Sequence, residues 1–133
     1  MKKPPRAAST EQQREQQLER RILLDGMKPN EARDEAFRHA VLSIPSGKVS
    51  TYGRVAAVAG YPLYHRAVAR LLRQEIADRL PWHRVVGAGG EIKLKFDAAH
   101  EQRQRLKLEG VTFKGTRVDM DKHEHHFRPW DSQ

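Results

Sequence analysis

Three histidines near the C-terminus have the spacing that most directly suggests chemistry. His123, His125 and His126 lie close together in the chain, and Asp121 or Glu124 could add an oxygen ligand for a metal ion. The chain has no cysteine, which excludes thiolate metal sites, disulfides and cysteine nucleophiles. A short acidic and histidine-rich tail is more typical of a solvated segment than of a metal site. We therefore expect no metal and no other cofactor.

Arginines form a second group of residues with chemical potential. Arg66, Arg70 and Arg73 recur at helical spacing, so they share one face of a helix expected over about residues 64–74. The whole chain is basic, because 25 Lys and Arg against 17 Asp and Glu give a formal net charge of +8 and a pI near 10.1. This excess favours a polyanionic partner, with nucleic acid first and an anionic membrane surface second. No apolar run approaches the ~18 residues of a spanning helix, and we expect no membrane partner.

The arginine-bearing helix completes a pattern of helices separated by turns. A first helix is expected over residues 30–44. Thr51 is a suitable cap for a short helix over residues 52–59, and Gly60 ends that helix. Two short helices joined by a turn that contains glycine predict a helix-turn-helix.

The chain after these helices predicts a small β element. Residues 82–86 read as a strand, residues 87–90 as a glycine turn, and residues 91–96 as a second strand that alternates apolar and charged side chains. A last helix is expected over residues 98–109, with Leu106 facing inward. The expected fold class is therefore mostly α, a winged helix-turn-helix-like DNA-binding domain with a small β wing.

The first 30 residues differ in composition from the rest. They form a basic and polar extension whose residues 11–24 are rich in helix formers but offer only a short apolar patch. We expect this extension to be partly helical or flexible, and a solubilising tail is at least as consistent with it as a partner-binding helix. The DNA-binding domain is expected over residues 31–133.

Four separated motifs carry a family resemblance, and they cover about residues 31–130. They are Ile-Pro-Ser-Gly-Lys-Val-Ser-Thr-Tyr-Gly at 44–53, Tyr-His-Arg-Ala-Val at 64–68, Pro-Trp-His-Arg-Val-Val at 81–86 and Leu-Glu-Gly-Val at 108–111. In this order they resemble the C-terminal domain of the O6-alkylguanine-DNA alkyltransferases. The active members read Pro-Cys-His-Arg, and their cysteine accepts the alkyl group irreversibly. Trp82 stands at that position, so the sequence is similar to the alkyltransferase-like proteins, which bind and flip the base but transfer nothing.

Elementary chemistry supports the loss of transfer. Displacement at an ether carbon needs a soft, strong nucleophile such as an activated thiolate. The indole of Trp82 is neutral, only donates hydrogen bonds and is too weak a nucleophile. His83 and Glu109 occupy the positions that activate the thiol in the active relatives, and buried hydrogen bonding explains their presence here. We therefore expect a protein that is not an enzyme.

The resemblance assigns roles to the helix-turn-helix, which this family docks in the minor groove. Tyr52 would rotate the target phosphate, although a tyrosine that packs the helix start is the simpler alternative. Arg66 would enter the base stack in place of the flipped nucleotide, whereas an ordinary phosphate contact competes with this role. Ala67 would allow close approach to the groove, and Arg70 and Arg73 would contact phosphate or solvent.

The resemblance also implies a lesion pocket around Trp82. Its members would be Trp82, His83, Arg84, Val85, Lys95 and Glu109, covered by a loop that includes residues 87–90. Lys95 falls where relatives place a cation that senses the guanine, but a solvated charge is equally consistent. Trp82 could also simply fill the core. The segment 74–80 lacks the Asn-Pro hinge of the active enzymes, and Gln74 is a possible substitute.

These features together predict a non-enzymatic DNA damage sensor. It would bind double-stranded DNA at O6-alkylguanine and, as the resemblance implies, flag the lesion for nucleotide excision repair proteins. We expect a cytoplasmic, nucleoid-associated monomer. The alternatives are a winged-helix regulator that reads sequence, which the small side chains of Ala67, Val68 and Ala69 disfavour, and a general DNA binder without lesion preference.

Overall fold

The computed structural model describes residues 11–16, 29–74 and 80–128. The chain divides into two units, residues 1–32 and residues 33–133, and each is described by itself. In the first unit, residues 11–16 are helical and their side chains are exposed. The rest of the helix predicted for residues 11–24 and the hinge segment 75–79 lie outside the described residues.

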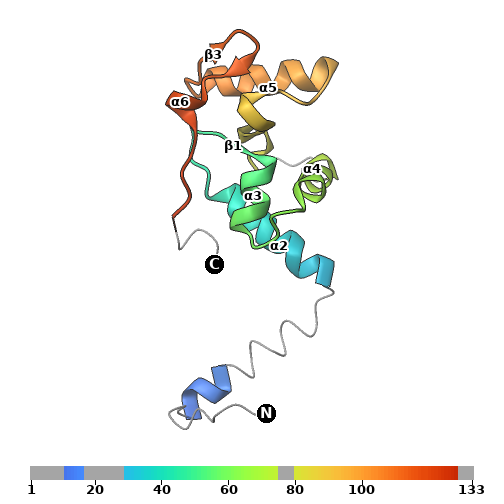
Figure 1. Ribbon diagram of the computed structural model, residues 1–133, viewed down its shortest axis with the longest axis vertical. Coiled ribbons are helices and arrows are strands. Elements are labelled where there is room, and N and C mark those ends of the chain that lie inside the picture. The colour runs from blue at the N-terminus through green and yellow to red at the C-terminus, as the bar shows by residue number, and fades with distance from the viewer. Residues whose placement is uncertain (1–10, 17–28, 75–79, 129–133) are drawn as a thin grey trace. The chain divides into compact units, whose positions relative to one another are not determined.

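Three helices form the first half of the second unit (Figure 1). They are α2 (Pro29–Leu42), α3 (Tyr52–Val58) and α4 (His65–Gln74). The predicted helix-turn-helix is α3 and α4, and its cap is also confirmed, because the Thr51 hydroxyl accepts a hydrogen bond from the Arg54 amide at 3.1 Å. Gly60 follows α3 with a φ of +98°, a left-handed conformation that glycine adopts without a steric penalty.

A single apolar cluster holds these helices together. Every three or four residues, a side chain from each helix points inward, which is the spacing of one helical face. Tyr52, Trp82 and Phe127 pack on the edge of the cluster. Its buried members are Phe37, Ala40, Val41, Ile44, Val55, Ala56, Ala67, Val68, Leu71, Leu72, Leu80 and Val85.

The second half is organised around a short parallel strand pair. β1 (Ser50–Thr51) pairs with β2 (Val85–Val86), with Ser50 opposite Val85 and Thr51 opposite Val86. Val85 belongs to the helical cluster, whereas Val86 joins a second cluster with Val49, Leu106, Val111 and Val118. The two faces of one strand thus connect the two cores.

The remaining elements surround this second cluster. They are two 3₁₀ turns, η1 (Trp82–Arg84) and η2 (Ala88–Gly90), a long helix α5 (Phe96–Leu108), an antiparallel pair β3 (Phe113–Lys114) and β4 (Arg117–Val118), and a short helix α6 (Met120–His123). Figure 1 shows α5, β3 and α6 at the opposite end of this unit from α2. After α6 the chain runs alongside β1, since the Val49 amide donates to the His123 carbonyl and the His125 amide donates to the Val49 carbonyl.

The strands predicted for residues 82–86 and 91–96 are confirmed only at residues 85–86, which form β2. Residues 82–84 form a 3₁₀ turn because His83 and Arg84 both reach the carboxylate of Glu109, and consecutive residues of a strand point to opposite faces. Residues 92–95 form no strand: Ile92 packs on the second cluster, while Leu94 faces a cavity described below. The alternation of apolar and charged residues in this segment therefore arises because Ile92 and Leu94 face two different apolar regions. The antiparallel pair is β3 and β4 instead.

Gly90 is expected to be essential for the stability of this half. Its φ is +90°, and a β-carbon at this position would lie 2.5 Å from the carbonyl oxygen of Val118. Gly90→Ala should lower the free energy of unfolding by about 3 kcal/mol, because left-handed strain adds to a clash with backbone that cannot easily move. Gly60→Ala is the matched control: its φ is +98° with nothing within 4 Å, so it should lose only about 1 kcal/mol. Equal losses in urea denaturation would contradict this account.

Candidate nucleic-acid interface

The exposed face of the helix-turn-helix is basic. Arg66, Arg70 and Arg73 are all exposed on α4, as the helical spacing predicted. Ala67 faces inward, because only 9% of it is exposed and its side chain belongs to the helical core, and its role in close approach to the groove stays a prediction. Ala69, which is half-buried, faces a cavity instead.

Tyr52 lies at the junction between this basic face and the interior. It is the first residue of α3, next to the Thr51 cap, and its ring is half-buried against the helical core. Burial raises the pKa of its phenol, although the nearby charge of Arg73 opposes the rise. The hydroxyl is therefore protonated at neutral pH and can donate a hydrogen bond to an anion such as a phosphate.

A cavity of about 310 Å³ opens between α3, α4, η1 and α5. Its size is at the lower end of the range typical for small-ligand sites. Most of its lining is apolar, and three charged side chains are placed among the apolar ones. The lining residues are Tyr52, Ala69, Leu72, Arg73, Trp82, Leu94, Ala98, Glu101 and Arg105.

Trp82 forms one wall of the cavity and carries a cation over its ring. The guanidinium carbon of Arg105 lies 5.3 Å from the ring centroid of Trp82, within the range of a cation–π contact. Arg105 is in turn held by Glu101 one helical turn earlier: Nε donates to Oε2 at 2.9 Å and Nη2 donates to the same oxygen at 2.7 Å. The aromatic wall and its cation are thus positioned by two elements, η1 and α5.

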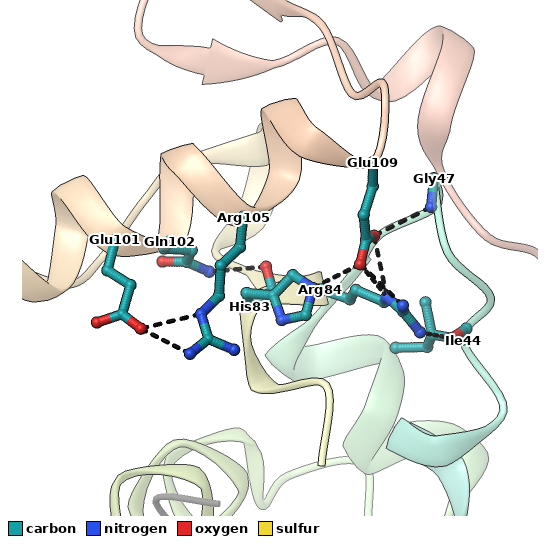
Figure 2. Close-up of polar contacts among 8 residues, drawn as sticks. All are labelled: Ile44, Gly47, His83, Arg84, Glu101, Gln102, Arg105 and Glu109. Carbon is teal, nitrogen blue, oxygen red and sulfur yellow. Dashed lines mark hydrogen bonds and ion pairs between the residues drawn. The ribbon is translucent and has the colours of Figure 1, made fainter. Parts of the chain in front are cut away.

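A charged network lies behind this wall (Figure 2). The carboxylate of Glu109 accepts hydrogen bonds from His83 Nε2 at 2.7 Å, from Arg84 Nη2 at 2.8 Å and from the Gly47 amide at 3.1 Å. Arg84 Nη1 also donates to the Ile44 carbonyl at 2.8 Å. The network therefore connects three segments of the chain: the turn after α2, η1 and the end of α5.

The environment fixes the protonation states of this network. Burial alone would raise the pKa of Glu109, but hydrogen bonds from Arg84, His83 and the Gly47 amide outweigh it and lower the pKa to about 2. Burial lowers the pKa of His83, against the opposing effect of Glu109. His83 is therefore neutral at pH 7, and its Nε2 carries the proton that Glu109 accepts. Its Nδ1 is buried and has no hydrogen-bond partner among residues 11–16, 29–74 and 80–128.

Gln102 fixes the backbone of this turn from α5. Its side chain is 1% exposed, and Nε2 donates to the carbonyl oxygens of His83 at 3.1 Å and Val85 at 2.9 Å. A strand partner would normally satisfy such carbonyls. The amide side chain thus replaces the ladder that the predicted wing would have supplied.

The predicted pocket residues occupy four different places. Trp82 lines the cavity. His83, Arg84 and Glu109 form the network behind it, and Val85 is fully buried in the core. Lys95 is exposed at the start of α5 and does not line the cavity.

The cavity also contains residues that the pocket prediction missed. Four of them, Leu94, Ala98, Glu101 and Arg105, come from the segment 94–105. Arg73 also lines the cavity, whereas it was expected to contact phosphate or solvent. Ala98, Glu101 and Arg105 follow one another at intervals of three and four residues, so they share a helical face. That spacing was a usable signal for a second face of α5 besides the inward face that carries Leu106.

One of the three C-terminal histidines, His123, has a structural role. His123 Nε2 accepts the Thr112 amide proton at 3.0 Å, and Nδ1 lies 3.2 Å from the Gly47 carbonyl, so this ring fastens α6 to the turn that also binds Glu109. In the part of the chain that the structure describes, no three side chains of His, Asp or Glu are grouped as metal ligands would be. No helix there is long and apolar enough to cross a membrane.

The fold and site define a class of DNA-binding protein. Residues 32–111 match the family described as 6-O-methylguanine DNA methyltransferase, DNA binding domain. This match spans more than half of the 133-residue chain, so the protein belongs to that family. The chain has no cysteine, and it therefore has no thiol that could accept an alkyl group.

Individual proteins of known name are also similar to this chain. The chain is 46% identical over 69 residues to a DNA base-flipping protein of Vibrio parahaemolyticus, covering 51% of this chain and 69% of that protein. It is 45% identical over 75 residues to alkyltransferase-like protein 1 of Schizosaccharomyces pombe, covering 54% of this chain and 69% of the relative. A crystal structure of S. pombe Atl1 in complex with damaged DNA containing O6-carboxymethylguanine has a TM-score of 0.62 and 30% identity, over 75% of this chain and 99% of that one.

Proposed function

We propose that this protein is a non-enzymatic sensor of O6-alkylguanine in double-stranded DNA. It docks α3 and α4 in the minor groove, turns the damaged nucleotide out of the helix and holds the base in the cavity beside Trp82. The observation that carries the proposal is this cavity: it opens next to the basic face of α4, and Trp82 lines it. The motif resemblance places Trp82 at the position of the acceptor cysteine.

Trp82 gives the cavity a binding role in place of a transfer role. An indole cannot displace an alkyl group from oxygen, but its flat apolar ring can stack on a base. Flipping a base costs a few kcal/mol, which stacking and apolar contact in a pocket offset. Leu72, Leu94 and Ala98 supply the apolar contact. The network of Glu109, His83 and Arg84 then supports the wall and performs no chemistry.

Tyr52 and Arg66 are the residues proposed to flip the nucleotide. Tyr52 has a protonated hydroxyl at a helix start and faces both the cavity and the basic surface, as rotation of a phosphate would require. Arg66 is exposed at the N-terminal end of α4, where a planar guanidinium can enter the stack and bond to the orphaned base. The similar structure of S. pombe Atl1 is a complex with damaged DNA, which supports binding of a damaged duplex by this fold.

A sensor without an acceptor leaves the lesion in place, so another activity has to remove it. We include in the proposal that the bound complex is recognised by nucleotide excision repair proteins. Adding the protein should then increase incision by a reconstituted excision nuclease on a duplex with O6-alkylguanine. If incision does not increase at a saturating concentration of the protein, the repair part of the proposal is refuted, whereas the proposed binding function is not affected.

Binding to matched duplexes tests the sensor directly. Three duplexes that differ only at one base, carrying guanine, O6-methylguanine or a bulkier O6-alkylguanine, are compared at fixed salt. We expect the protein to bind the two lesion duplexes at least about tenfold more tightly than the guanine duplex. The reason is that the free energy of transferring a base into an apolar pocket differs by a few kcal/mol between a lesion and a paired guanine. Equal affinities would identify a general DNA binder instead.

Arg66→Ala should remove most of this lesion preference while leaving affinity for the undamaged duplex within a few-fold. Arg70→Ala is the matched control, because it deletes the same charge one turn away on the same exposed face. The Arg70→Ala variant should bind all three duplexes more weakly by the same factor. It should also lower the slope of log affinity against log salt by about 0.9. An Arg66→Ala variant that behaves like Arg70→Ala would show that Arg66 is only a phosphate contact.

A further inference from the structure

Arg105 is a cation that lies over the aromatic wall of the cavity, and nothing in the motifs shared with the family singled it out. Its guanidinium carbon lies 5.3 Å from the centre of the Trp82 ring, and its side chain is 40% exposed. It lines the cavity together with Leu94 and Ala98. A charged group in such a position has to act on whatever occupies the space in front of Trp82.

The guanidinium is oriented by only one of its edges. Nε and Nη2 both donate to Glu101 Oε2, whereas Nη1 has no hydrogen-bond partner within the ranges that the structure describes. Figure 2 shows that the third nitrogen of Arg105 points away from Glu101. Arg105 is thus held in place and still has N–H donors to offer.

The charge balance of the lining favours an anion. Arg73 and Arg105 contribute two positive charges, and Glu101 contributes one negative charge that is already paired with Arg105. The other lining residues are uncharged. Apolar walls reduce screening by water, so a charge-assisted hydrogen bond made here is stronger than on an open surface.

We propose that Arg105 is a specificity-determining residue that favours O6-alkylguanines whose substituent carries a carboxylate. This inference rests on the proposed function, because it needs the flipped base to enter the cavity with its substituent toward position 82. An acceptor residue at that position in the active relatives has to contact the alkyl carbon, so Trp82 faces the substituent. A methyl group offers nothing to Arg105, whereas a carboxylate accepts its free N–H groups.

The test uses the full chain and four duplexes that differ at a single base. The base is guanine, O6-methylguanine, O6-carboxymethylguanine or O6-carbamoylmethylguanine, the last being a neutral amide of nearly the same shape as the carboxylate. Wild-type protein should bind the carboxymethyl duplex about fivefold or more tightly than the carbamoylmethyl duplex, as expected when one charged hydrogen bond replaces a neutral one. Arg105→Gln should reduce this ratio to about one and weaken binding of O6-methylguanine by a smaller factor than binding of O6-carboxymethylguanine.

A matched control separates local recognition from overall charge. Arg103→Gln removes the same charge from the same helix at a residue outside the cavity lining, and it should keep the wild-type ratio. Glu101→Gln removes the carboxylate that holds Nε and Nη2 of Arg105, so more N–H groups can reach the ligand. The ratio of carboxymethyl to carbamoylmethyl affinity should then rise.

The outcomes distinguish the inference from the proposed function. If the wild-type protein prefers all three lesions over guanine but binds the carboxylate and the amide equally, the role of Arg105 is refuted and the sensor stands. If Arg105→Gln weakens all three lesions by one common factor, the side chain only packs on Trp82, and the inference again fails. If the wild-type protein binds all four duplexes equally, the sensor itself is wrong.

Discussion

Glu109→Gln is expected to lower the free energy of unfolding by about 3 kcal/mol, a large effect for a change of one atom. The carboxylate accepts hydrogen bonds from Gly47, His83 and Arg84, and its side chain is only 15% exposed. An amide has one oxygen in place of two, and it presents an N–H group to the donors of Arg84. Removing one partner of a buried ion pair costs about 3–5 kcal/mol, because the other charge remains without compensation. We take the lower value since Arg84 is 19% exposed.

Urea denaturation at pH 7 measures this loss, and Glu91→Gln is its control. Glu91 makes a longer ion pair with Lys93, at 3.5 Å, and its side chain is 45% exposed. Exposed pairs contribute about 0–1 kcal/mol, so the control should unfold almost as the wild type does. Equal stabilities of the Glu109→Gln variant and the wild type would mean that the network does not stabilise the fold.

The pH dependence of the same comparison has a definite sign. The folded state lowers the pKa of Glu109 from its ordinary value of 4.5 to about 2, so the unfolded chain binds the proton more readily. The carboxylate therefore contributes its full stability above about pH 4.5 and loses it as the pH falls toward 2. The gap between wild type and Glu109→Gln should narrow over this window. The difference between the two curves is the informative quantity, because the buried His83 makes each protein less stable on acidification.

The helix-turn-helix was predictable because its signals are local. Thr51 caps α3, Gly60 ends it, and the inward residues of α4 recur every three or four positions. Each signal acts within one or two helical turns, so a single sequence displays it. The buried face and the exposed arginines of α4 follow from the same spacing.

The β wing was not predictable from the same kind of pattern. β1 and β2 pair in parallel across a long stretch of chain, and the alternation in residues 91–96 gives no sign of that partner. The turn at Trp82–Arg84 is set by Glu109, which lies 25 residues after Arg84. Both features depend on where α5 packs, and packing over that sequence distance is a property of the whole fold.

The same distinction between local signals and long-range packing applies to the residues of the candidate site. Trp82 was identified as a pocket residue because residues 81–86 resemble a motif of the family. Its neighbours Glu101 and Arg105 were missed because they face the cavity only once α5 lies beside η1. Of the two interpretations offered for Lys95, its position agrees with the solvated charge, since it lies exposed at the start of α5 and outside the cavity lining.

Trp82→Ala should reduce affinity for O6-methylguanine DNA at least about tenfold and leave affinity for undamaged DNA nearly unchanged. The variant loses the ring on which the flipped base would stack, and stacking on an aromatic side chain contributes about 1–3 kcal/mol per base. Arg66 and Arg70, which are proposed to contact the undamaged duplex, are exposed on α4 and do not line the cavity. Affinity is measured with matched duplexes at fixed salt, as for Arg66→Ala.

Trp82→Phe provides the control that separates stacking from general damage to the pocket. Phenylalanine keeps an aromatic face for the base and for Arg105 at the same wall, so most of the lesion preference should remain. Trp82 is half-buried at the edge of the core, and unchanged binding of undamaged DNA verifies that each variant is folded. If Trp82→Ala retained the lesion preference, the base could not be held at this wall. The preference would then have to arise from the exposed face of α4, where Arg66 is the first residue to test.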